Sequence, residues 1–207
     1  VFIMTTVFSF NVFGVDIRYT NEDGKTVKLT DFRDTQGHWA HDQILKWADY
    51  EIINGYNGNF MPNDYIIRGD LSIIIDRLTE LKNQTYNYFT DLKNDDYFSE
   101  AMLKCVARGY INGVGNKQLN PRGNATREEV AVIFCRVFNI DTSYSGSTGF
   151  KDDSNISSWA RSSVYALSKA GYLNGTPDGY VLPKNNITRA ELITLLDNFA
   201  DTYIPNS

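Results

Sequence analysis

The chain has 207 residues, of which 42% are apolar and 14% aromatic, enough to form the packed core of one or two domains. Twenty basic and 25 acidic residues give a net charge of −5, which argues against a general nucleic-acid binder because such proteins show a basic face. Two cysteines and two histidines exclude a disulfide scaffold and leave too few ligands for a zinc centre. The composition predicts a protein without a metal ion, a cofactor or a metal- or thiol-dependent activity.

The first fourteen residues, VFIMTTVFSFNVFG, carry no charge. As a helix rising ~1.5 Å per residue, this segment is too short to cross a ~30 Å hydrocarbon layer. The preferred interpretation of 1–14 is the remnant of a signal peptide, with Val12 and Gly14 at the small-residue positions. The alternative is a β-strand, since apolar and polar residues alternate around Phe8 and Phe10. Over 15–30, β-rich flanks around Asp23-Gly24 predict a β-hairpin.

The rest of the chain repeats itself three times. Each copy carries Phe-x-Asp, a large aromatic residue, Asn-Gly, a proline and an arginine, always in this order. The marks are Phe32 to Asp34, Phe89 to Asp91 and Phe150 to Asp152; Trp39, Tyr97 and Trp159; Asn54-Gly55, Asn112-Gly113 and Asn174-Gly175; Pro62, Pro121 and Pro183; Arg68, Arg127 and Arg189. Such self-similarity predicts one supersecondary unit copied three times with a shared core, over 31–82, 88–140 and 149–203.

Each repeat is predicted to fold as helix, loop and helix. The second helix has apolar residues at i, i+3, i+4 and i+7, which are Leu71, Ile74, Ile75 and Leu78; Val130, Ile133, Phe134 and Val137; Leu192, Leu195, Leu196 and Phe199. A capping box starts this helix in two repeats, where Thr126 precedes Glu129 and Thr188 precedes Glu191. The predicted fold class is mainly all-α: a six-helix body with approximate threefold repetition, folded as one domain, with a short N-terminal β-hairpin.

The ordered set of marks resembles the S-layer homology (SLH) module. Trp39-Ala40, Trp159-Ala160 and the tetrapeptide Thr188-Arg189-Ala190-Glu191 match that family's motifs. The resemblance implies three tandem SLH repeats arranged as a pseudo-trimer, whose grooves bind secondary cell-wall polysaccharide that often carries a pyruvate ketal. It also implies a secreted, cell-wall-associated module that anchors a larger exported cargo, with no nucleic-acid partner and no membrane association in the mature form.

The three arginines are the first candidate ligand-binding residues, because a guanidinium forms two parallel hydrogen bonds with a carboxylate. Arg127 and Arg189 are also expected at the first position of a helix, where free amides favour an anion. The alternative is that the arginines pair with Asp or Glu residues between repeats. The first repeat departs from the family pattern, so Arg189 is expected to contribute most to binding and Arg68, with a poorly ordered helix start, least.

Three further sets of candidates follow from the repeats. The aromatic residues Trp39, Tyr97 and Trp159 can stack on sugar rings, although packing into the core is the preferred interpretation. The glycines Gly55, Gly113 and Gly175 are expected to form turns that need a positive φ, and secondarily to let the backbone approach a ligand. The aspartates Asp34, Asp91 and Asp152 are expected to cap a helix or to bind the arginine, with sugar contact as the bolder alternative.

Other functions receive less support from the sequence. The first alternative is a helical-repeat scaffold that binds proteins and no carbohydrate. The second is a wall hydrolase, which needs two carboxylates at a defined separation that no pair here suggests. His38 and His41 lack further ligands for a metal ion. Cys105 and Cys135 are expected to remain unpaired, because nothing in the sequence fixes their separation, with a disulfide in an exported protein as the alternative.

Overall fold

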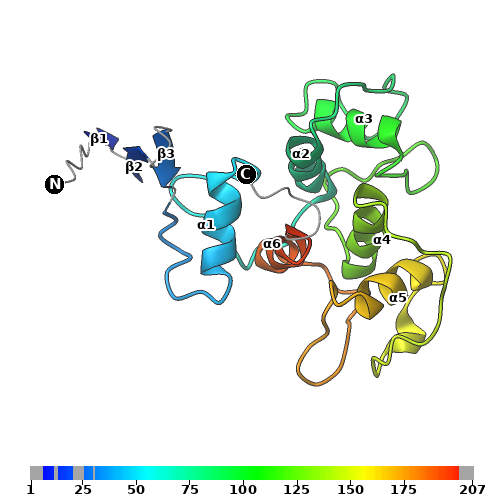
Figure 1. Cartoon of the computed structure of the whole chain (residues 1–207). Coiled ribbons are helices and arrows are strands. Elements are labelled where there is room, and N and C mark those ends of the chain that lie inside the picture. The colour runs from blue at the N-terminus through cyan, green and yellow to red at the C-terminus, as the bar shows by residue number, and fades with distance from the viewer. Residues whose placement is uncertain (1–6, 12–13, 21–25, 30, 201–207) are drawn as a thin grey trace. The chain divides into compact units, whose positions relative to one another are not determined.

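The computed structural model describes residues 7–11, 14–20, 26–29 and 31–200 (Figure 1). Those residues form six α-helices, one short 3₁₀ helix and three strands, which confirms the mainly helical fold class. None of the helices in these ranges is long and apolar enough to cross a membrane. The chain divides into two compact units: Val1–Asp64 with Arg189–Thr194, and Tyr65–Thr188 with the residues from Leu195 onward.

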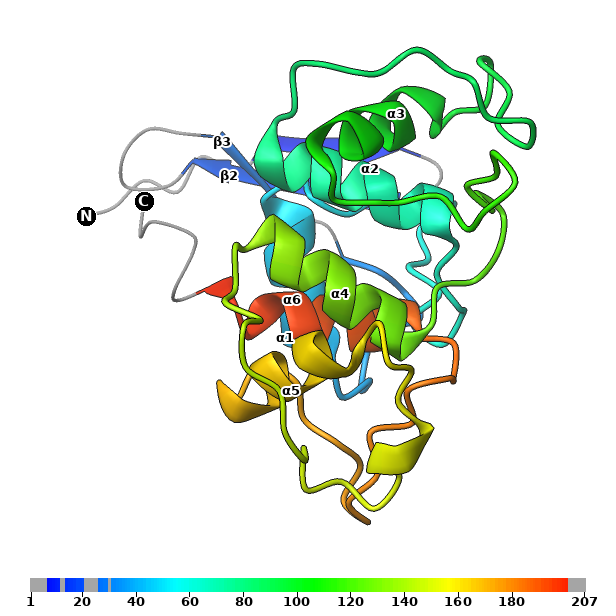
Figure 2. The same cartoon turned by 90° about the vertical axis from the view of Figure 1, so that its right-hand side faces the viewer.

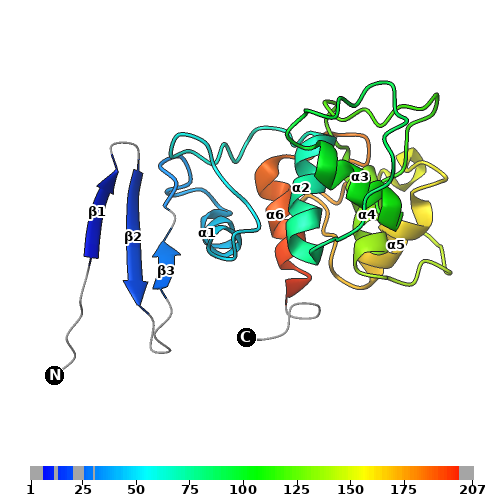
Figure 3. The same ribbon diagram turned by 90° about the horizontal axis from the view of Figure 1, so that it is seen from above.

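The first unit begins with an antiparallel sheet of three strands in the order β1-β2-β3 (Figure 3). Strand β2 (Gly14–Thr20) pairs with β3 (Thr26–Leu29), which confirms the predicted hairpin, while its turn lies outside the described residues. Strand β1 (Val7–Asn11) pairs with β2 and places a strand in the segment for which a signal-peptide remnant was the preferred interpretation. The other residues of 1–14, apart from Gly14, lie outside the described ranges.

The helical part of the first unit combines the first repeat as far as Asp64 with the start of helix α6 (Arg189–Asp197). Helix α1 (His41–Asp49) buries Ile44, Trp47 and Ala48 on one face. Helix α6 begins in this unit. Its first two amides donate to the carbonyl oxygens of Asp64 and Pro62, at 2.8 and 2.9 Å, so the start of α6 is joined to the loop of the first repeat.

The second unit contains the helices α2 (Arg68–Thr79), α3 (Ser99–Arg108), α4 (Arg127–Val137) and α5 (Arg161–Lys169), and the 3₁₀ helix Asp153–Asn155. Helix α2 packs against α3, and α4 packs against α5 (Figure 2). The predicted apolar stripes are buried, except that Leu78 and Val137 at their ends are partly exposed. The periodicity of the sequence therefore identified the inward faces correctly.

An aromatic cluster joins the second and third repeats within this unit. The ring of Phe199 stacks on Phe138 and on Tyr172, with centroids 4.2 Å apart in both pairs. Phe134 meets Phe138 and Phe199 edge to face, at 5.5 and 5.7 Å. Because aromatic pairs contribute beyond the area that they bury, this cluster stabilises the packing of the segment just after α6 against α4.

Candidate functional site

The aspartate of each Phe-x-Asp motif holds the loop that precedes the proline. Asp34 accepts hydrogen bonds from the amides of Phe60 and Met61, at 2.8 and 2.6 Å. The other two repeats show the same arrangement, in which Asp91 binds the amides of Leu119 and Asn120, and Asp152 those of Val181 and Leu182. Each aspartate thus holds two consecutive loop amides, which is a different role from the predicted helix capping.

The three arginines make equivalent contacts to the next repeat in a cyclic order, in which the third repeat contacts the first. In each case Nε donates to the carbonyl oxygen of a loop residue whose amide binds the aspartate, and Nη2 donates to the carbonyl oxygen of the Asn-Gly asparagine. The acceptors are Leu119 and Asn112 for Arg68, Val181 and Asn174 for Arg127, and Phe60 and Asn54 for Arg189. Each arginine therefore has a structural role, since it fixes both ends of the neighbouring loop.

The first two amides of α2, α4 and α6 are not free to bind an anion. The amides of Arg127 and Glu128 donate to the carbonyl oxygens of Asn185 and Pro183, both at 3.0 Å. The first two amides of α2 and α6 are bound in the same way by the loop of the next repeat. The predicted positions of Arg127 and Arg189 at the first residue of a helix are confirmed. The expectation of free amides there was wrong, because packing between repeats satisfies the first two donors.

Of the three repeat arginines, Arg68 is the least exposed to solvent, at 4%. Besides its two carbonyl acceptors, its Nη1 pairs with Glu129 Oε1 at 3.0 Å. Burial lowers the pKa of Arg68, and the nearby carboxylate of Glu129 offsets part of this effect. The expectation of a poorly positioned Arg68 was wrong, whereas the alternative of an arginine–glutamate pair between repeats is confirmed here.

The glycines of the Asn-Gly motifs are required by close packing. A Cβ at Gly175 would meet the ring of Phe150 and, at 2.8 Å, the carbonyl oxygen of Tyr180. Gly55 and Gly113 face the same kind of obstruction from a loop carbonyl oxygen. None of these three glycines has a positive φ; in each repeat that conformation occurs a few residues later in the loop, at Gly58, Gly115 and Gly179. The expectation of a positive φ in the Asn-Gly motif was therefore wrong.

The large aromatic residues of the repeats lie on the surface. Trp39, Tyr97 and Trp159 are 62%, 68% and 58% exposed, so the preferred interpretation of core packing was wrong. The residue after each of them enters the core instead, and Ala40, Phe98 and Ala160 are fully buried. The aromatic faces are thus available to a ligand.

A cavity of about 410 Å³ lies in the second unit and is lined by residues of all three repeats. It brings together three of the predicted site residues, Arg68, Gly113 and Trp159. The other lining residues were not predicted, namely Asn112, Val114, Glu129, Val132, Ile133 and Arg136. None of the other predicted site residues lines this cavity.

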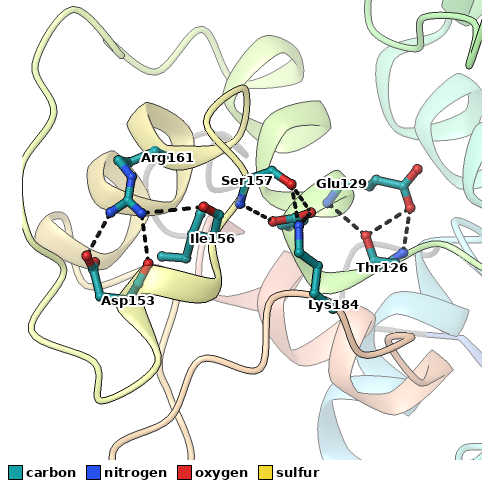
Figure 4. Close-up of polar contacts among 8 residues, drawn as sticks. Thr126, Glu129, Asp153, Ile156, Ser157, Arg161 and Lys184 are labelled. Atoms are coloured by element: carbon teal, nitrogen blue, oxygen red, sulfur yellow. Dashed lines mark hydrogen bonds and ion pairs between the residues drawn. The ribbon is translucent and has the colours of Figure 1, made fainter.

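A second polar cluster joins α4 to the third repeat (Figure 4). Glu128, only 3% exposed, accepts hydrogen bonds from the amide and hydroxyl of Ser157, both at 2.9 Å, and from Lys184 Nζ at 2.6 Å. Beside it, Thr126 and Glu129 form the predicted capping box at the start of α4. Glu128, which stands where the family tetrapeptide has alanine, thus joins α4 to the third repeat.

Metal binding and thiol chemistry find no support in the described ranges. These ranges contain no group of three histidine, cysteine, aspartate or glutamate residues that could hold a metal ion. Cys105 and Cys135 are buried and unpaired. Burial raises the pKa of the Cys105 thiol to about 12 and that of Cys135 to about 11, so neither is a reactive thiolate at neutral pH.

Arg136 is the functional candidate that the repeat pattern could have revealed. It lies nine residues after Arg127, just as Arg77 lies nine residues after Arg68, while the third repeat has Asn198 there. A polar side chain recurring beside an apolar stripe is a weak signal, because most such residues only face solvent. Only the position of Arg136 in the cavity lining distinguishes it.

Comparison with known proteins gives the same organisation. The family model of the S-layer homology domain matches residues 31–72, 88–131 and 149–193, more than half of the chain. The chain is 35% identical to an amylopullulanase of Thermoanaerobacterium thermosulfurigenes, covering 80% of the chain and 9% of that protein. It is 34% identical to exoglucanase XynX of Acetivibrio thermocellus (84% of the chain, 16% of that protein). A cellulosome-anchoring protein of A. thermocellus is 34% identical over 45% of the chain and 21% of its own length.

The chain therefore spans a small part of these relatives, between 9% and 21% of their length. The region that matches the two enzymes is correspondingly a minor segment of each. Three consecutive matches to one family model, each coinciding with a helix–loop–helix repeat, show that this chain belongs to the S-layer homology family.

Proposed function

We propose that this chain holds a larger exported protein to the bacterial cell wall by binding secondary cell-wall polysaccharide, and that the module itself is non-catalytic. Surface anchoring as such follows from membership of the SLH family, and the chain is a cell-surface module. The polysaccharide, its pyruvate ketal and the cargo are the parts proposed here. The cellulosome-anchoring protein and the surface-layer 125 kDa protein of Lysinibacillus sphaericus among its relatives are consistent with this role.

The cavity of the second unit carries the proposal. Its lining combines the half-exposed indole of Trp159, two apolar residues of α4 and the arginines Arg68 and Arg136. An aromatic face suits the apolar face of a sugar ring, and guanidinium groups suit hydroxyls and carboxylates. In a chain of net charge −5, such a site binds an anionic glycan through local contacts rather than through a broad positive field.

The direct test is co-sedimentation of the protein with purified peptidoglycan sacculi, before and after acid extraction of the attached polysaccharide. We expect binding to intact sacculi, loss of binding after extraction, and competition by the extracted polymer. Binding that survives the extraction would overturn the polysaccharide as ligand. Release of reducing sugar during the incubation would contradict a non-catalytic module.

A pair of variants places the binding at the cavity. Trp159→Ala removes an aromatic face from the cavity lining, and the expected loss of affinity is on the order of threefold to tenfold. Tyr144→Ala is the matched control, because Tyr144 is 77% exposed and does not line the cavity. Equal binding by both variants and the parent protein would mean that the glycan binds elsewhere.

A further inference from the structure

One face of α4 forms a wall of the cavity. Glu129, Val132, Ile133 and Arg136 line it at positions i, i+3, i+4 and i+7, the spacing of a single helix face. Seven residues at ~1.5 Å rise separate the two charged ends of this wall by about 10 Å. Between them, Val132 and Ile133 are 8% and 4% exposed and give the wall an apolar centre.

The charges at the Arg68 end of the wall neutralise each other. Arg68 donates to Glu129 Oε1, and the other carboxylate oxygen of Glu129 accepts hydrogen bonds from the amide and hydroxyl of Thr126. Arg68 also uses Nε and Nη2 for loop carbonyl oxygens. A ligand that took either side chain of this pair would have to break contacts that join two repeats.

Arg136 provides the excess positive charge of the cavity. Within the described part of the chain it forms no ion pair, and its one hydrogen bond runs from Nη1 to the carbonyl oxygen of Tyr110 at 3.2 Å. The residue is exposed, so the other N–H groups of its guanidinium are accessible to a ligand. Among the residues that line the cavity, Arg136 is thus the cation whose charge no carboxylate balances.

We infer that Arg136 receives the anionic group of the glycan in this cavity, while Arg68 serves as part of the wall. The inference rests on the proposed function and adds a specificity-determining residue to it. A carboxylate at Arg136 gains a charge-assisted hydrogen bond without displacing a protein partner. A neutral glycan keeps the contacts with Trp159 and loses this one, so Arg136 selects for the acidic polymer.

The third repeat supplies a substitution that separates the charge from the structural contact. Asn198 stands at the position equivalent to Arg136, and its Nδ2 donates to the carbonyl oxygen of Tyr172 at 2.7 Å, as Arg136 does to Tyr110. Asparagine at position 136 is therefore expected to keep the hydrogen bond to the Tyr110 carbonyl oxygen, as Asn198 does to Tyr172 at the equivalent position. Arg108→Asn is the matched control, because it removes one exposed positive charge from the same repeat outside the cavity.

The experiment measures the binding of both variants to two forms of the acid-extracted wall polysaccharide, untreated and with its carboxylates chemically reduced to alcohols. We expect Arg136→Asn to weaken binding of the untreated polymer about tenfold or more and to leave binding of the reduced polymer unchanged. The parent protein should bind the reduced polymer weakly. Arg136→Asn should bind both the untreated and the reduced polymer with that same low affinity. Arg108→Asn should behave as the parent protein on both.

Each other outcome has a definite meaning. If the parent protein binds the polymer and Arg136→Asn binds it equally well, the assignment of Arg136 is wrong while the proposed function stands. If the parent protein binds neither form, both are wrong. Melting curves accompany the binding curves, and Arg136→Lys, which keeps the charge and loses the planar fork, should retain part of the preference for the acidic polymer even if Arg136→Asn is unstable.

Discussion

Gly69, at the second position of α2, lies against the ring of Phe98, so closely that a Cβ at position 69 would stand 2.6 Å from two of its carbon atoms. Phe98 is fully buried at the start of α3, where the other repeats have Ala40 and Ala160. Gly69 stands where the family tetrapeptide has alanine. The missing methyl group leaves room for the large Phe98 ring of the next repeat.

This contact predicts that Gly69→Ala destabilises the protein although alanine is the better helix former. Overpacking costs about 1–3 kcal/mol, while the gain in helix propensity is about 0.5–1 kcal/mol. The measurement is the free energy of unfolding in urea. The double variant Gly69→Ala/Phe98→Ala should be more stable than the sum of the two single effects predicts, and strict additivity would contradict the steric explanation.

Arg68→Ala is expected to lower the free energy of unfolding more than Arg127→Ala or Arg189→Ala. Arg68 is buried, and its loss removes the partner of two loop carbonyl oxygens and of the partly exposed Glu129, which typically costs about 1–3 kcal/mol for each buried group left unsatisfied. The other two arginines are only partly buried. Equal losses of stability for the three variants in denaturant titrations would refute this order.

The two cysteines are expected to resist thiol reagents in the folded protein. Their pKa values are raised to about 12 and about 11 by burial, above the ordinary value of about 8.5. Because a raised pKa in the folded state favours the protonated thiol, the stability linked to these groups is lost as the pH rises beyond about 8.5.

The check is labelling with iodoacetamide at pH 8, with and without guanidinium chloride. Cys105 and Cys135 should be modified only in the denatured protein. Rapid modification under native conditions, or an intact mass lower by two hydrogens, would show that the thiols are exposed or joined.

Asp153 is expected to make the protein less stable at acid pH than at neutral pH. The amide and hydroxyl of Thr148 lower the pKa of Asp153. The guanidinium of Arg161, which donates to the Asp153 carboxylate, lowers it further (Figure 4). A carboxyl whose pKa is lower in the folded state stabilises the fold above its unfolded pKa of about 3.9, and this contribution is lost as the pH falls through the folded value.

The measurement compares melting temperatures of the parent protein and Asp153→Asn from pH 7 down to pH 3. The difference should be largest near neutral pH and should shrink below about pH 4. Asp178→Asn, an exposed carboxylate of the same repeat, serves as the control. A pH-independent difference would mean that the charge of Asp153 does not matter.

The sequence by itself determined the repeats, the helices and the family. Spacings of three and four residues between apolar side chains, as for Val130, Ile133 and Phe134, define a buried helix face because the helical period is local. The capping box of Thr126 and Glu129 is local for the same reason and was predicted correctly.

Only the tertiary structure decided what the marked residues contact. The acceptors of Arg68 Nε and Nη2 lie 51 and 44 residues away in the sequence, and those of Arg189 lie 129 and 135 residues away. In the sequence, Arg136 is only a polar residue beside the apolar stripe of an amphipathic helix. Its place in a cavity lined by all three repeats follows from their packing. Which residues become partners depends on which faces of the repeats pack together. Close packing selects those faces by the shapes of the side chains, and the spacing of residue types along the chain does not specify them.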